Sequence, residues 1–232
     1  PNSVAPVYAY SPSEYTLISY YDRSIYTFEN KYTLQGSLRT DGSSKYPPET
    51  RWGVFPAAGF SWNINEENFL KDSNVLSDLK LRVTYGVTGQ QDGIGYYGYE
   101  PTYALTTNDT KYPINGVYYN GLTPSAYDTS LKWETTDAFD AGFDFGFLNQ
   151  RIYGTIDYYN RKTKDLLARV FIPAGSNFTN ELTTNVGNTI SHGFELNVTG
   201  IPIKTRNFSW TVNYNIAYNS VTITNLYLTP NP

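Results

Sequence analysis

The sequence predicts an all-β protein made of antiparallel, up-and-down strands, and three observations support this fold class. Apolar and polar side chains alternate along several long segments, which is the period of a strand with one apolar and one polar face. The connections between these segments alternate between short turns and long loops. No stretch has a convincing helical period, apart from a short turn near 66–70. Together these features indicate part of the wall of a transmembrane β-barrel.

The N-terminal half of the chain contains four expected strands, at about 17–28, 31–41, 51–64 and 79–89. The first has no clean apolar face, and the face of the second is weak. The apolar faces of the last three consist of Tyr32, Leu34 and Leu38; Trp52, Val54, Pro56, Ala58, Phe60, Trp62 and Ile64; and Leu79, Leu81, Val83, Tyr85 and Val87.

The strand expected at 134–147 shows the clearest alternation. Four phenylalanines and one alanine share a face, whereas aspartate and glycine occupy the other. We expect the apolar side chains to face lipid and the carboxylates to face the barrel interior, because a shift of one residue would invert every side chain. The apolar set is Phe139, Ala141, Phe143, Phe145 and Phe147, and the polar set is Asp140, Gly142, Asp144 and Gly146.

Three more strands are expected at about 150–163, 188–200 and 207–221. The first is mixed, with Ile152, Ile156 and Tyr158 opposite Tyr153, Asp157 and Arg161. The other two repeat the alternation. Their apolar faces are Phe194, Leu196 and Val198, and Phe208, Trp210, Val212, Tyr214, Ile216 and Tyr218; Asn213 and Asn215 are expected to point inward.

The lengths of the connections sort by parity. One end of the sheet receives Glu29 and Asn30, then 65–78, 148–150 and 201–206, which are mostly tight. The other end receives 42–50, 90–133 and 164–187, and the last two of these are longer than the ~15 residues that most loops reach. Short turns at one end and long loops at the other are the arrangement of periplasmic turns and extracellular loops in outer-membrane barrels.

Composition excludes several other classes of protein. The 232 residues carry a net charge of −4, which argues against binding to nucleic acid by phosphate neutralisation. With no cysteine and a single histidine, His192, no metal site and no cofactor are expected. No apolar run approaches the ~20 residues of a spanning helix. The chain starts at Pro1 and contains no methionine, so we expect a processed product or a fragment.

No group of residues supports an enzymatic activity. Asp140 and Asp144 are four residues apart on one strand, so they should lie ~13 Å apart, whereas paired catalytic carboxylates in glycosidases need ~5–9.5 Å. Ser191 beside His192 does not make a catalytic triad, which requires spatial rather than sequence adjacency. We therefore predict that the protein is not an enzyme.

A tyrosine- and glycine-rich stretch lies within the longest loop. Tyrosine offers a large contact area with a polar tip, so this stretch is a candidate surface for a ligand or a lid, and a self-packed loop is the alternative. The candidate contact residues are Tyr96, Tyr97, Tyr99, Tyr103, Tyr118 and Tyr119. The four tryptophans lie near strand ends, as in an interfacial girdle, with Trp62 and Trp210 expected on the periplasmic side and Trp52 and Trp133 on the extracellular side.

Several sequence blocks resemble the SusC/RagA-like TonB-dependent transporters of Bacteroidetes, in the order and spacing of that family. They include Arg-Thr-Asp-Gly-Ser-Ser-Lys-Tyr at 39–46, Leu-Lys-Trp-Glu-Thr-Thr at 131–136 and Asn-Val-Gly at 185–187. The other blocks are 55–62, 65–70, 76–90, 143–147, 158–167 and 193–196. Together the blocks extend over about 17–221, which is most of the chain.

The resemblance implies active import of oligosaccharides or peptides across the bacterial outer membrane. It implies a 22-stranded barrel plugged by an N-terminal domain, energy from TonB, and a SusD-like surface lipoprotein as an extracellular lid. Residues 1–232 would form one partial barrel domain of about eight strands, without the plug, completed by the remaining strands and surrounded by outer-membrane lipid. A soluble β-rich glycan-binding module and a small autonomous barrel or adhesin are the alternatives.

The small and charged residues on the inward faces favour a large barrel over a small one. Eight strands close into a barrel whose interior is filled by side chains. The inward positions here mix glycines with charged residues, as at Gly59, Gly142, Lys80 and Asp140, and would not fill such an interior densely. We therefore expect an open, curved wall in which the first strand does not pair with the last.

Overall fold

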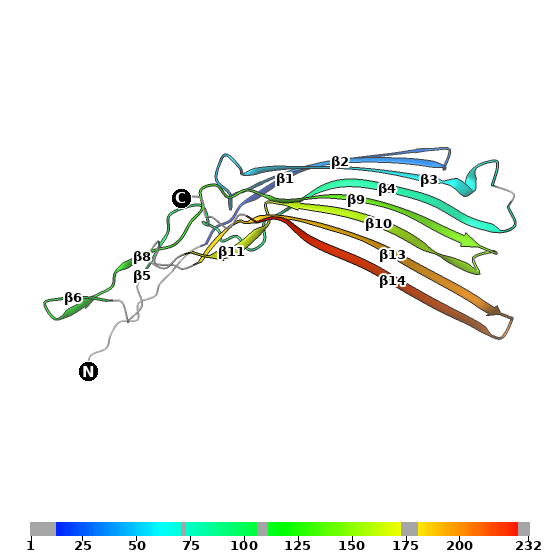
Figure 1. The fold of residues 1–232 in the computed structure, drawn as a ribbon. Helices are drawn as coiled ribbons and strands as arrows, with labels where there is room; N and C mark the ends of the chain where they lie inside the picture. Colours follow the sequence, from blue (N-terminus) through cyan, green and yellow to red (C-terminus); the bar gives the residue numbers. More distant parts are fainter. Residues whose placement is uncertain (1–12, 71–72, 106–110, 173–180, 227–232) are drawn as a thin grey trace.

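The computed structural model describes residues 13–70, 73–105, 111–172 and 181–226. Within this part of the chain, eight long strands form one antiparallel sheet in the order β1-β2-β3-β4-β9-β10-β13-β14 (Figure 1). Each long strand pairs with the next long strand in sequence, which confirms the up-and-down topology. The long strands are β1 (Leu17–Phe28), β2 (Tyr32–Ser43), β3 (Trp52–Asn63), β4 (Leu76–Gln90), β9 (Glu134–Phe147), β10 (Ile152–Lys164), β13 (Gly187–Lys204) and β14 (Ser209–Leu226).

All eight expected strands are present, and the sequence reading missed only short strands within the two longest loops. These pair locally as three small hairpins, whose strands of three to five residues carry too little alternation to be recognised. The hairpins are β5 (Tyr103–Leu105) with β8 (Leu122–Pro124), β6 (Tyr112–Ile114) with β7 (Val117–Tyr119), and β11 (Leu167–Phe171) with β12 (Glu181–Asn185). Residues 106–110 and 173–180 of these loops lie outside the described residues.

The sheet is an open, curved wall (Figure 1). Strands β1 and β14 lie at its two edges, and neither pairs with the other in the described part of the chain. The expectation that the first and last strands do not pair is therefore confirmed.

The connections sort to opposite ends of the sheet as predicted (Figure 1). One end, called the turn end here, holds the connections after β1, β3, β9 and β13, including a 3-10 helix, η1 (Ile64–Glu66). The opposite end, the loop end, holds the connections after β2, β4 and β10, and the β5–β8 and β6–β7 hairpins project from it. The tight turns use left-handed residues, with Asn30 and Asn149 both at φ 55°. Among the described residues, no helix is long and apolar enough to cross a membrane.

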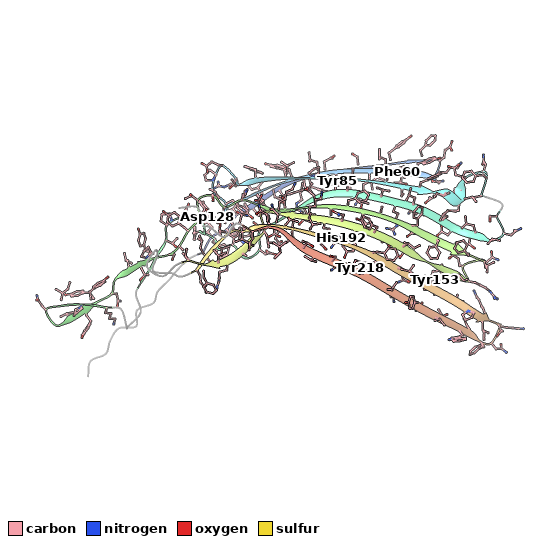
Figure 2. The ribbon with its side chains drawn as sticks, viewed as in Figure 1. Phe60, Tyr85, Asp128, Tyr153, His192 and Tyr218 are labelled. Carbon is pink, nitrogen blue, oxygen red and sulfur yellow. The ribbon has the colours of Figure 1, made fainter. Side chains whose placement is uncertain are left out.

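The strand registers align apolar residues into continuous rows across one face of the sheet. Two successive rows contain almost only apolar and aromatic side chains, among them Phe60 and Tyr218 (Figure 2), and many of these side chains are exposed. This face is called the outer face. One row is Phe28, Tyr32, Trp62, Leu81, Phe143, Ile156, Leu196 and Ile216; the next is Tyr26, Leu34, Phe60, Val83, Ala141, Tyr158, Phe194 and Tyr218.

The opposite face is polar and concave. A hollow of about 600 Å³ on this side is lined mainly by alternate residues of β3, β4, β9 and β10, among them Arg82, Asp140 and Arg161. Small residues such as Gly59 and Ala138 form part of its floor. Because a hollow forms on the inside of a curved sheet, the carboxylates face the concave side and Phe139, Phe143 and Phe145 have the opposite facing, as predicted.

Two stacked aromatic pairs mark the two ends of the apolar band on β3. Trp62 stacks on Tyr32 at the turn end, with ring centroids 6.1 Å apart, and Trp52 stacks on Tyr20 at the loop end, at 6.2 Å. The ten residue steps from Trp52 to Trp62 cover about 33 Å along the strand. Tilted as in a membrane barrel, this length spans about 25 Å, the height of the apolar belt.

The four tryptophans lie at the ends of the sheet that the sequence predicts for them, although Trp133 does not belong to a girdle. Trp52 lies at the loop end, whereas Trp62 and Trp210 lie at the turn end. Trp133 also lies at the loop end, but it is buried rather than part of an interfacial girdle. The physical reason is that Trp133 precedes β9 and packs among the connections at the loop end, which are called the loop layer below. Other aromatic residues enclose it there.

Candidate functional site

The loop end of the sheet is the candidate site, because the long connections and several of the recognised sequence blocks meet there. The concave face below it carries an ion triad. Arg82 on β4 donates to both carboxylate oxygens of Asp144 on β9, at 2.8–3.0 Å, and to Asp157 on β10 at 2.8 Å. Three neighbouring strands are thus cross-linked by one guanidinium group, whose planar donors suit this bidentate geometry.

An aromatic core covers the loop end on the concave side. Trp133 packs against Tyr46 and Phe55, with ring centroids 4.8 and 5.4 Å apart. The Tyr46 hydroxyl donates to the backbone oxygen of Gln90 at 3.0 Å, and the Trp133 indole N–H donates to that of Arg51 at 3.0 Å. The other buried members of this core are Ile94 and Leu131.

Two glycines make space for this core. A Cβ built at Gly53 would lie 2.4 Å from the Phe55 ring, and one built at Gly89 would lie 2.1 Å from it. Phe55 therefore lies over the backbone of β3 and β4 on the concave face. Glycine at both positions permits this close approach.

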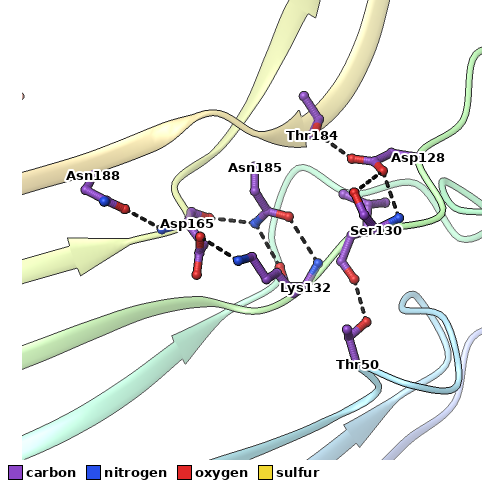
Figure 3. Close-up of polar contacts among 9 residues, drawn as sticks. Thr50, Asp128, Ser130, Lys132, Asp165, Thr184, Asn185 and Asn188 are labelled. Atoms are coloured by element: carbon purple, nitrogen blue, oxygen red, sulfur yellow. Dashed lines mark hydrogen bonds and ion pairs between the residues drawn. The ribbon is translucent and has the colours of Figure 1, made fainter. Parts of the chain in front are cut away.

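Asn185, at the end of β12, is hydrogen-bonded to two distant segments (Figure 3). Its side-chain amide accepts from the Lys132 backbone N–H at 3.1 Å and donates to the Lys132 carbonyl at 2.9 Å. The same amide nitrogen donates to the Asp165 carbonyl at 2.7 Å. The segments 128–134, 165–167 and 184–188 that meet around Asn185 are called the rim cluster below.

Further contacts strengthen the rim cluster. Lys132 forms an ion pair with Asp165 at 2.9 Å. Glu134 accepts from the backbone N–H of Leu167 at 2.8 Å. Asn188 accepts from the Asp165 N–H at 3.0 Å. The rim cluster therefore joins the C-terminal end of the long loop to both ends of the 165–187 connection.

Two threonine hydroxyls add to this network, that of Thr184 within the rim cluster and that of Thr50 outside it (Figure 3). The Thr184 hydroxyl donates to Asp128, which also accepts from the N–H and the hydroxyl of Ser130. The Thr50 hydroxyl, in the 44–51 connection, donates to the carbonyl oxygen of Leu131 at 2.5 Å. All three connections at the loop end are thereby linked to one another.

The six candidate tyrosines do not form one surface. Tyr96 lies 6.0 Å from Tyr15, centroid to centroid, with the Lys45 ammonium near both rings, and the Tyr97 hydroxyl accepts from the Glu14 N–H. Tyr99 packs against the aromatic core. The other three, Tyr103, Tyr118 and Tyr119, are exposed on the projecting hairpins. Their assignment as contact residues stays a prediction.

Burial raises the pKa of two tyrosine hydroxyls in the loop layer. Burial raises the pKa of the Tyr46 hydroxyl well above its ordinary value, and the nearby Glu134 and Asp92 carboxylates raise it further. Burial, followed by a hydrogen bond with Glu100, also raises the pKa of Tyr99. Both hydroxyls therefore remain neutral hydrogen-bond donors at ordinary pH.

The carboxylates and the histidine are not assembled for metal binding or for nucleophilic chemistry. Asp144 is held by Arg82, whereas Asp140 lines the hollow. His192 lies opposite Asn160 and Ser220 in the sheet register. In the described ranges, no group of three or more His, Cys, Asp or Glu is placed to hold a metal ion.

The sequence did not predict the rim cluster, although the sequence blocks that form it resemble those of a known family. The blocks 131–136, 158–167 and 185–187 lie far apart in sequence and meet only at the loop end. The available signal was that each block stands at the loop-end terminus of a long strand. Antiparallel pairing of the long strands then brings these termini together.

The chain matches a protein family model described as "TonB dependent receptor-like, beta-barrel" over residues 1–231. It is 46% identical over 211 residues to the TonB-dependent receptor SusC of Bacteroides thetaiotaomicron, covering 91% of this chain and 21% of that protein. It is 34% identical over 206 residues to the TonB-dependent receptor P39 of Formosa agariphila, covering 88% and 19%. The chain thus spans about a fifth of the length of these curated relatives.

Solved structures show the same architecture. The RagAB peptide transporter matches with a TM-score of 0.81 and 29% identity, over 92% of this chain and 23% of that chain. The siderophore receptor PirA from Pseudomonas aeruginosa matches with a TM-score of 0.60 and 15% identity, over 89% of this chain and 35% of that chain. The second likeness concerns the fold alone.

Proposed function

Because the chain belongs to the TonB dependent receptor-like β-barrel family, we propose that it serves in an outer-membrane importer of oligosaccharides or peptides. The observation that carries this proposal is the two-sided wall. The outer face is a continuous apolar surface suited to lipid, and the concave face is polar and wet. Such a wall encloses a polar passage across a membrane.

The structure argues against the two alternative functions. A soluble glycan-binding sandwich would pack its apolar face against a second sheet, but the exposed outer face of the long-strand sheet has no such partner among the described residues. A small autonomous barrel would require β1 to pair with β14, which it does not in the described part of the chain. Free sheet edges cannot face hydrocarbon, so further strands must complete the barrel.

The likeness to SusC and to RagAB also suggests partners for this chain. We propose that the loop end is extracellular and meets a SusD-like surface lipoprotein acting as a lid. The remaining strands and a plug domain would close and fill the barrel, and TonB would supply the energy. RagAB is a peptide transporter, and that cargo is stated of RagAB alone.

Uptake by cells that carry the full-length parent protein tests the proposal. Cells should accumulate an oligosaccharide or a peptide in a TonB-dependent manner, and deleting residues 95–120 should impair uptake while the protein still reaches the outer membrane. Normal uptake after the deletion would reduce the tyrosine-rich stretch to a packing role. A parent protein that imports no member of either cargo class would refute the import function itself.

A further inference from the structure

The side-chain amide of Asn185 makes three hydrogen bonds, all to backbone groups of two other segments. Both N–H donors of its side chain are engaged, one with the carbonyl of Lys132 and one with that of Asp165, and its oxygen accepts from the N–H of Lys132. A side-chain amide has two N–H donors and one oxygen that can accept two hydrogen bonds, so three of the four possible bonds are made.

The pairing with Lys132 imitates one step of a β-ladder. A neighbouring strand would offer one acceptor and one donor to the N–H and C=O of the same residue, and the Asn185 amide offers the same pair. It does so at the point where the long loop ends and β9 begins at Glu134. The side chain therefore takes the place of a strand where the sheet itself does not continue.

Several hydrogen bonds surround Asn185 without involving its side chain. Leu166 donates to Gly187 and Val186 donates to Leu166, both at 2.8 Å between backbone atoms. Glu134 accepts from the N–H of Leu167. These bonds hold the base of the β11–β12 hairpin against the end of the long loop, and Asn185 lies between the two.

We infer that Asn185 is a positioning residue that keeps the C-terminal end of the long loop, 128–133, and the base of the β11–β12 hairpin together as one body during transport. The inference rests on the proposed import function. The loops then present one preorganised surface to a lid or a cargo, which lowers the entropic cost of binding.

Hydrogen exchange of the full-length protein in detergent tests the coupling without any need for cargo. In Asn185→Ala, the amides of Lys132, Leu166 and Leu167 should all exchange about tenfold faster, as expected for the loss of about one net hydrogen bond's stabilisation. Only the first of these amides bonds to Asn185 directly. Acceleration confined to Lys132 would therefore overturn the inference, because it would show a local contact without coupling.

Two further variants separate positioning from a general loss of structure. Asn185→Asp keeps the shape and the acceptor for the Lys132 N–H, but loses both donors and turns a negative charge toward two carbonyl oxygens. We expect it to accelerate exchange at Leu166 and Leu167 as the alanine does. Asn120→Asp, an exposed change at the same end of the sheet, adds the same charge and should leave exchange at all three amides unchanged. Equal effects of the two aspartates would contradict the role of Asn185.

A disulfide lock tests whether the two segments stay together during uptake. The side chains of Asp128 and Thr184 already touch, and the 232 residues contain no cysteine, so a cysteine pair can be placed at these positions. In the Asn185→Ala background the half-saturating cargo concentration should rise severalfold at unchanged maximal rate, and the oxidised Asp128→Cys, Thr184→Cys pair should restore it. Uptake that stops on oxidation and returns on reduction would show that the segments must part.

Discussion

At the residue scale, glycines decide where the aromatic side chains of the wall can lie. On the outer face, a Cβ at Gly42 would come within 2.8 Å of the Trp52 indole, which crosses β2 to reach Tyr20. On the concave face, Gly53 and Gly89 leave room for Phe55. These positions lack a side chain because a ring from a neighbouring residue already occupies the space.

The closeness of Phe55 to β4 makes a substitution at Gly89 informative. Gly89→Ala should displace the Phe55 ring and destabilise the full-length protein by about 1–3 kcal/mol, as overpacking does. Gly36→Ala is the matched control, because a Cβ there meets nothing within 4 Å. Unfolding in denaturant with refolding into detergent measures both. Equal losses for the two variants would contradict the account of Phe55.

The facing of β9 predicts unequal costs for two polar changes. Phe143→Arg places a cation on the lipid face near the middle of the apolar band, so it should destabilise the folded protein by about 2–4 kcal/mol. Asn215→Ser, on the concave face of β14, should cost far less. Folding titrations into lipid vesicles compare them. A larger loss for Asn215→Ser would reverse the assigned sidedness.

Glu67 at the turn end predicts a pH dependence. The hydrogen bond from the Tyr32 hydroxyl lowers the pKa of the Glu67 carboxyl, and those from Lys31 and Trp62 act in the same direction. A depressed pKa stabilises the fold above the unfolded-state pKa, and this contribution disappears as pH falls through the folded-state pKa. The denaturation midpoints of the native protein and Glu67→Gln should therefore differ at neutral pH and converge as the pH falls through the folded-state pKa of Glu67. A difference that is independent of pH would exclude a titrating Glu67 contact.

At the scale of elements, the loop layer is held by a core of its own. Trp133 joins the end of the long loop to the 44–51 connection through its packing on Tyr46 and its hydrogen bond to Arg51. The rim cluster adds the third connection. The bases of the three loop-end connections are therefore packed together over the mouth of the wall, whereas the β6–β7 hairpin projects from it (Figure 1).

This packing predicts that one tryptophan stabilises the whole layer. Trp133→Ala should destabilise the loop layer by about 3–5 kcal/mol, the usual cost of deleting a buried Trp, and the segments around Ile94 and Leu131 that pack with Trp133 should become sensitive to protease. Trp52→Ala removes an exposed tryptophan at the same end and should leave these loops resistant. Limited proteolysis of the folded protein in detergent distinguishes the two, and equal resistance would disprove the anchoring role of Trp133.

At the scale of the whole molecule, the two unpaired edges of the sheet determine how residues 1–232 behave when they are produced alone. Strands β1 and β14 each present an open row of backbone groups in the described sheet, and such groups cost several kcal/mol each in hydrocarbon. Residues 1–232 produced alone should therefore need detergent and should fail to form a closed barrel.

Gel mobility provides the measurement for this last prediction. Closed membrane barrels migrate differently in detergent gels before and after heating, so the full-length protein should show a heat-dependent shift that residues 1–232 alone do not. Longer pieces of the protein that add strands at either edge should remain unshifted until the barrel is complete. A heat-dependent shift of the isolated 232 residues would indicate a closed small barrel.

The sequence by itself determined the eight long strands, the faces of those with clear alternation and the sorting of loops to one end, because these features depend on local alternation and on chain order. Runs such as Phe139 to Phe147 allow only one register when one face meets lipid. The tertiary structure alone decided how the loops close over the wall. Trp133 became a core residue rather than a girdle residue, and Lys132, Asp165 and Asn185 became one cluster. Such contacts join residues far apart in sequence, and they exist only because antiparallel strands return each segment to the same end of the sheet.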